Sequence, residues 1–117
     1  MAYMLLILEE RGDRQVRGVE QGRVVYDRML RFAADLTARG VLKGGDALKS
    51  ESERVRVALR DGKRTLLDGP FAEAKEMVGG YFLLDCKTRE EAVAIARECP
   101  AAEWATVEVR EIGTCFE

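Results

Sequence analysis

Asp68 is the carboxylate whose surroundings in the sequence best fit chemistry. It ends an apolar run and directly precedes Gly69-Pro70, a pair typical of a turn at the end of a strand. At the rim of a pocket, partly removed from water, such a carboxylate could move a proton to or from a bound molecule. The position also fits a turn aspartate that accepts hydrogen bonds from nearby backbone N–H groups. Both interpretations stay open.

Three further polar side chains follow within a short stretch. Lys75 could neutralise Asp68 or bind an anionic ligand, Glu76 stands beside it, and Tyr81 could donate a hydrogen bond into the same cleft. The alternative is an exposed helical lysine and a packed tyrosine. We therefore take Asp68 as the candidate catalytic residue and Lys75, Glu76 and Tyr81 as candidate ligand contacts.

Histidine is absent from all 117 residues. This removes Ser-His-Asp and Cys-His catalysis, histidine-ligated metal sites and the commonest general base near neutral pH. The carboxylates show no convincing metal-binding spacing, and the paired glycines lack the context of a phosphate-binding loop. We expect no metal and no cofactor.

Charge and hydropathy narrow the class of partner and the location. Lys and Arg number 19 against 21 Asp and Glu, a net charge of −2, which argues against a nucleic-acid partner. The longest apolar run, residues 2–8, is too short to span a membrane and does not resemble a signal peptide. Three cysteines without a paired spacing predict reduced thiols, and hence a cytoplasmic protein.

The elements that must position these residues follow from the hydrophobic periodicity. We predict a strand at 2–8, a polar loop at 11–18, a helix at about 20–39 ended by Gly40, and a short strand within 41–48.

The second half of the chain is predicted to form further strands and one more helix. Residues 54–60 and 63–67 predict a hairpin around Asp61-Gly62. The other expected elements are helical turns at 72–77, a break at Gly79-Gly80, a strand at 81–86, a helix from a Thr88/Glu91 capping box to Pro100, and a strand at about 104–112.

The hairpin is rich in basic residues. They could bind an anion or an acidic partner, or they could keep the edge of a sheet charged and so prevent aggregation. The basic residues are Arg54, Arg56, Arg60, Lys63 and Arg64.

This order of elements predicts an α+β fold, a ferredoxin-like sandwich in which two helices cover one face of an antiparallel sheet. Residues 1–117 would form a single domain. The strands at 2–8 and 81–86 are apolar on both faces and should be central. Because two helices cover only one face, we expect the other face to be buried in a homodimer.

One stretch carries a resemblance to a known family. The string D-G-P-F-A-E-A-K-E at 68–76, followed by Gly79-Gly80-Tyr81-Phe82, resembles the YCII-related family, in particular the branch named for its D-G-P-F motif. The resemblance implies a dimeric ferredoxin-like fold with a cleft near this segment, which adds Phe71 to the candidate ligand contacts. The family's proposed His-Asp pair cannot operate here, because this chain has no histidine.

Three functions are compatible with the sequence. The first is a dimeric protein that binds a small polar metabolite in a cleft near the D-G-P-F segment. The second is a cofactor-free acid–base enzyme that uses Asp68. The third is a regulatory or interaction module without catalysis; the family resemblance implies the type that accompanies sigma-factor-like regulators. Whether the protein is an enzyme stays open at this point.

Overall fold

The computed structural model describes residues 2–50, 54–68 and 75–116, with the main chain alone at 67 and 68. In these ranges the elements, in chain order, are β1 (Ala2–Glu10), α1 (Asp13–Ala38), β2 (Leu42–Ala47), β3 (Val55–Arg60), β4 (Lys63–Asp68), β5 (Glu76–Asp85), α2 (Arg89–Glu98), the 3₁₀ helix η2 (Pro100–Glu103) and β6 (Thr106–Glu111).

Four of the strands form one antiparallel sheet. Its spatial order is β2-β5-β1-β6, so the two strands expected in the centre are the central ones. With β3 and β4 set aside, the sequence of elements is βαββαβ, and this strand order is that of a ferredoxin-like sandwich. The predicted α+β fold class is confirmed.

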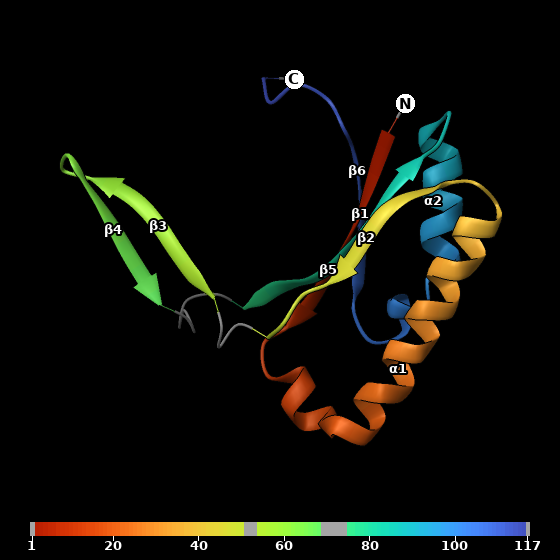
Figure 1. Cartoon of the computed structure of the whole chain (residues 1–117), viewed down its shortest axis with the longest axis horizontal. Helices are drawn as coiled ribbons and strands as arrows, with labels where there is room; N and C mark the ends of the chain where they lie inside the picture. The colour runs from red at the N-terminus through yellow and green to blue at the C-terminus, as the bar shows by residue number, and fades with distance from the viewer. Residues whose placement is uncertain (1, 51–53, 69–74, 117) are drawn as a thin grey trace.

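Both helices lie on the same side of this sheet (Figure 1). Leu5 and Ile7 on β1 are buried against them, and in α1 the buried residues are Phe32 and Leu36. The rings of Phe32 and Phe82 meet edge to face, with centroids 5.4 Å apart. The core thus lies between the helices and one face of the sheet.

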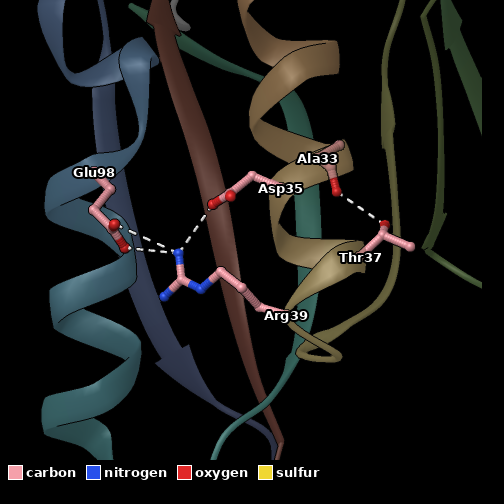
Figure 2. A network of polar contacts seen from close by, with 5 residues as sticks. All are labelled: Ala33, Asp35, Thr37, Arg39 and Glu98. Carbon is pink, nitrogen blue, oxygen red and sulfur yellow. Dashed lines mark hydrogen bonds and ion pairs between the residues drawn. The ribbon is translucent and has the colours of Figure 1, made fainter.

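The ends of the helices follow the expected signals. Gly40, with a φ of 75°, ends α1 in the left-handed conformation, and the Thr88 hydroxyl accepts a hydrogen bond from the Glu91 N–H at the start of α2. Figure 2 shows Arg39 between the two helices, where its Nη1 lies 3.1 Å from Asp35 Oδ2 and 3.2 Å from Glu98 Oε2. This exposed network ties the end of α1 to α2.

In the described part of the chain, no helix covers the opposite face of the sheet. Met4, Leu6 and Leu8 alternate with the buried residues of β1 and are only partly covered. Leu83 lies opposite Met4, and Tyr81 lies opposite Leu6, on the neighbouring strand. We call this the open face.

The predicted hairpin is confirmed as β3–β4, with Asp61 and Gly62 both at positive φ in the turn. This hairpin, Val55–Asp68, forms a separate two-stranded sheet and extends away from the rest of the molecule (Figure 1). We call it the arm. It enlarges the molecule, whose radius of gyration is 16.0 Å, where a compact chain of this length would have about 13 Å.

The prediction for residues 11–18 was wrong. The helix begins at Asp13 and not near residue 20, because Gly18 does not end it. Gly18 adopts φ 81° and ψ 169°, a conformation open essentially to glycine alone, and it kinks α1 into a short first segment and a long second one. The glycine that suggested a loop is therefore a hinge inside the helix.

The start of β5 also differs from expectation. Residues 76 and 77 belong to the strand and not to a helical turn, and Gly79-Gly80 does not interrupt it. Gly80 pairs with Ile7 and Val78 pairs with Leu8, so Gly79 is an extra residue in a β-bulge. The rest of the predicted turns, residues 72–74, lies outside the described residues.

Cys86 and Cys99 are buried in the core, and their burial raises the pKa of both thiols; Cys115 is exposed. All three cysteines are free. Within the described ranges, no helix has the length and apolar character needed to cross a membrane.

Candidate functional site

A large cleft of about 930 Å³ opens between α1 and the sheet. Its lining comes from both segments of α1, from β1, β2 and β5, from residues 48–50, and from Ala101 and Trp104. Apolar side chains make up most of its walls, a composition typical of small-molecule sites.

Glu9 is the buried charge of this cleft. It continues the alternation of β1, so its side chain shares the helix-facing side with Leu5 and Ile7, and only 5% of the residue is exposed. Arg14 holds it on both oxygens: Nε lies 3.0 Å from Oε1, and Nη2 lies 2.7 Å from Oε2. This two-point pairing neutralises the buried carboxylate and fixes its orientation.

Arg14 also joins two other parts of the cleft. Its Nη1 donates to the carbonyl of Leu48 at 2.7 Å, and its Nη2 donates to the carbonyl of Gly79 at 3.2 Å. Guanidinium has five N–H groups, and these four contacts with described residues leave one N–H on Nη1 for a ligand. The Glu9 carboxylate likewise retains lone pairs beyond the two that Arg14 occupies.

The two glycine features of the sequence make this arrangement possible. The kink at Gly18 turns the first segment of α1, which carries Arg14, relative to the long second segment. At Gly79 a β-carbon would overlap Oε2 of Glu9, so the carboxylate can lie there only because that residue has no side chain. We call this set of residues the Glu9–Arg14 site.

Aromatic rings contribute to the same walls. Phe82, Tyr26 and Trp104 line the cleft, and Tyr26 is about half exposed. The guanidinium groups of Arg17 and Arg28 lie 5.9 and 5.4 Å from the centre of the Trp104 ring, within the range of cation–π contacts. Trp104 thus lies partly buried between α1 and the start of β6.

Those residues of the predicted site that the structure describes lie apart from one another. Tyr81 borders the cleft, but its side chain alternates with Phe82 and so belongs to the open face, where its hydroxyl is 3.5 Å from Asp46 Oδ2. Lys75 is exposed, and its carbonyl accepts a hydrogen bond from the Arg11 N–H. The main chain of Asp68 ends β4, in the arm; its side chain, and all of Phe71, lie outside the described residues.

Glu76 lines a second, smaller hollow of about 370 Å³. This hollow is acidic, since Glu10, Asp13 and Glu103 also line it. No group of three or more His, Cys, Asp or Glu in the described part of the chain could hold a metal ion.

Sequence reasoning missed Glu9 and Arg14, although a signal was present. Tyr3, Leu5 and Ile7 alternate toward the core, and extending the same period by two residues places Glu9 beside them. A carboxylate at a core-facing position needs a partner, and Arg14 is the second arginine after it. Because the apolar run ends at Leu8, the predicted strand stops there and leaves Glu9 out.

The fold has a counterpart among solved structures. The chain is similar to 5-chloro-2-hydroxyhydroquinone dehydrochlorinase from Burkholderia phenoliruptrix AC1100, solved in complex with 2,5-dihydroxybenzoquinone. The TM-score is 0.56 and the identity 16%, over 97% of this chain and 94% of that one. At this identity the similarity establishes a shared fold.

Sequence comparison gives a closer but shorter match. An uncharacterised protein of Rhizobium meliloti (strain 1021) is 42% identical over 45 residues, which are 38% of this chain and 36% of that protein. The match therefore spans little more than a third of the relative's length. Residues 1–114, by contrast, match the YCII-related domain almost from end to end. The chain belongs to the YCII-related family.

Proposed function

We propose that this protein binds a small, flat molecule in the cleft between α1 and the sheet, with the Glu9–Arg14 site recognising its polar groups. The observation that carries the proposal is a buried carboxylate held on both oxygens by an arginine at the wall of a mostly apolar cleft. Small-molecule sites commonly combine apolar walls with a few fixed polar groups in this way.

The polar groups suggest the chemistry of the ligand. The remaining N–H of Arg14 would donate to a carbonyl or phenolate oxygen, and the Glu9 carboxylate would accept from a hydroxyl. Aromatic side chains in the walls, such as Tyr26 and Phe82, favour a flat ring. Together these features fit a hydroxylated aromatic or quinone in which an oxygen acceptor lies next to a hydroxyl.

The fold neighbour offers a suitable probe. Its solved complex contains 2,5-dihydroxybenzoquinone, a flat ring in which each hydroxyl stands beside a carbonyl. That similarity supports the choice of probe and does not assign the neighbour's reaction to this chain.

Isothermal titration calorimetry with this compound tests the proposal. Gly22 lines the cleft from α1 and has open space around the position of a β-carbon, so Gly22→Phe should fill the cleft and abolish binding. Gly22→Ala is the matched control and should keep binding within about twofold. Equal affinity for the wild type and Gly22→Phe would rule out the cleft as the site.

Acid–base catalysis by Asp68 stays a prediction, as do the roles of Lys75, Glu76, Tyr81 and Phe71. The variant Asp68→Asn would distinguish catalysis by Asp68 from binding alone. If Asp68 is catalytic, this variant loses turnover of the bound ligand, while the affinity of the cleft for the ligand persists. A regulatory module without a ligand would instead show no saturable heat on titration with 2,5-dihydroxybenzoquinone.

We also propose that the protein is a homodimer assembled through the open face. Met4, Leu6 and Leu83 contribute apolar surface there, and both helices of the described ranges lie on the other side of the sheet. The three free thiols, Cys86, Cys99 and Cys115, fit a reducing compartment such as the cytoplasm.

A further inference from the structure

The arm has one apolar face that is exposed to solvent. Val57 on β3 pairs with Leu66 on β4, so the two side chains project from the same side of the hairpin. Val55 and Leu59 alternate with Arg56 and Ala58 and lie on that side too. The exposed fractions of these four residues are 54% for Val55, 60% for Val57, 54% for Leu59 and 71% for Leu66.

An arm of this kind has little stability of its own in a single chain. A two-stranded hairpin is marginally stable in water unless a further strand or a helix packs against it. Here four large apolar side chains on one face have little cover. The arm therefore needs a surface that this chain does not supply to itself in the described residues.

The position of the arm indicates where that surface comes from. In Figure 1 the helices lie to the right of the sheet and the arm lies to its left. The arm thus extends on the side of the open face, where a second copy would pack. We propose that the arm embraces a second copy of this chain, with Val55, Val57, Leu59 and Leu66 packed on the partner; this inference rests on the proposed homodimer.

Electrostatic complementarity favours a second copy as the occupant. Residues 55–68 carry four cations and two carboxylates, a net charge of +2, so the rest of the chain carries −4. On the open face, Asp46 lies opposite Tyr81 on one outer strand, and Glu108 and Arg110 lie opposite Leu6 and Met4 on the other. A basic arm such as this one would be attracted to the net negative charge that the rest of another copy carries.

The exposed area of the chain is consistent with this role. Its accessible surface is 8286 Å², whereas a folded monomer of this mass exposes roughly 6,400 Å². The excess of roughly 1,900 Å² is more than the ~800 Å² that each partner contributes to a standard interface. An exchanged arm together with a sheet-to-sheet contact would account for an excess of this size.

Sedimentation of the full chain tests the arm separately from the open face. We expect a dimer for the wild type, and for Val57→Lys/Leu66→Lys a dissociation constant raised at least 100-fold. Ala58→Lys/Thr65→Lys adds the same charge to the opposite face of the arm, because Ala58 and Thr65 pair across it, and should change the constant by less than about fivefold. All four positions are on the protruding hairpin, so the fold of the body should be unaffected.

Photo-crosslinking identifies the occupant directly. p-Benzoylphenylalanine at position 57, in an equal mixture of ¹⁴N- and ¹⁵N-labelled chains, should yield crosslinked peptides of mixed isotope. The proposed role of the arm would be contradicted by crosslinks within single chains only. It would equally be contradicted if Val57→Lys/Leu66→Lys left the dimer intact. Neither result would contradict the homodimer. A monomeric wild type would overturn both. Calorimetry of the same variants with 2,5-dihydroxybenzoquinone reports independently on the cleft.

Discussion

The carboxylate of Glu9 occupies the space in which a side chain at position 79 would lie. Gly79 is the extra residue of the bulge between β5 and β1, and its carbonyl accepts hydrogen bonds from both the Leu48 N–H and Arg14. One glycine thus sets the position of the buried charge, the arginine that neutralises it, and the segment that follows β2.

Gly79→Ala should therefore destabilise the protein strongly. The new methyl group must displace Glu9 and weaken its contact with Arg14, and overpacking of this kind costs about 3 kcal/mol. Thermal unfolding should show a lower Tm, by roughly 10 °C for a chain of this size. Gly44→Ala is the matched control, because nothing lies within 4 Å of a β-carbon there. If the two variants have equal Tm values, the packing of Glu9 against Gly79 is wrong.

Removing the charge of Arg14 alone should lower the free energy of unfolding more than removing the charges of both Arg14 and Glu9. Arg14→Gln leaves the Glu9 carboxylate buried without its cation, which typically costs about 3–5 kcal/mol. Glu9→Gln/Arg14→Gln removes both charges and should recover part of that loss.

Urea denaturation of the two single variants and the double variant measures this coupling between Glu9 and Arg14. Arg39→Gln is the control, because it removes an arginine from an exposed ion-pair network (Figure 2) and should change the midpoint little. Strictly additive effects of the two substitutions would contradict a direct contact between Glu9 and Arg14.

Two alanine substitutions within α1 should have opposite signs. Gly18 has φ 81° and ψ 169°, so Gly18→Ala forces a side chain into strained backbone and should cost about 1–3 kcal/mol. Gly22 lies in regular helix with open space around it, and Gly22→Ala should stabilise by about 0.5–1 kcal/mol. Circular dichroism during thermal unfolding gives both values. Stabilisation by Gly18→Ala would mean that the helix does not kink there.

Much of the fold could be predicted from the sequence because its signals are local. The double apolar faces of 2–8 and 81–86 identified the central strands, and Asp61-Gly62 and the Thr88/Glu91 pair marked a turn and a helix start that the structure confirms. The strand order followed from these elements together with the rules of connection.

The candidate site could not be predicted because it depends on contacts between distant residues. Gly18 and Gly79 both read as breaks along the chain, yet one kinks a helix and the other accommodates a bulge. Only their joint effect brings Arg14 to Glu9. The prediction at Asp68 relied on the D-G-P-F segment, residues 68–71, whose side chains lie outside the described residues.

Protonation of Glu103 should change stability at acid pH. Arg28 donates to both carboxylate oxygens of Glu103, and this hydrogen bonding holds the pKa of Glu103 below its ordinary value of 4.5. Because the folded state binds this proton less tightly than the unfolded state, the contribution of Glu103 to the free energy of unfolding is fully present above pH 4.5. It is lost as pH falls through the lowered pKa.

Wild type and Glu103→Gln should thus differ in urea midpoint at pH 7, and their midpoints should converge in acid. The difference at pH 7 should also shrink in 1 M salt, since the pair is exposed. A difference that grows as pH falls would reverse the sign of this linkage and contradict the Arg28–Glu103 contact.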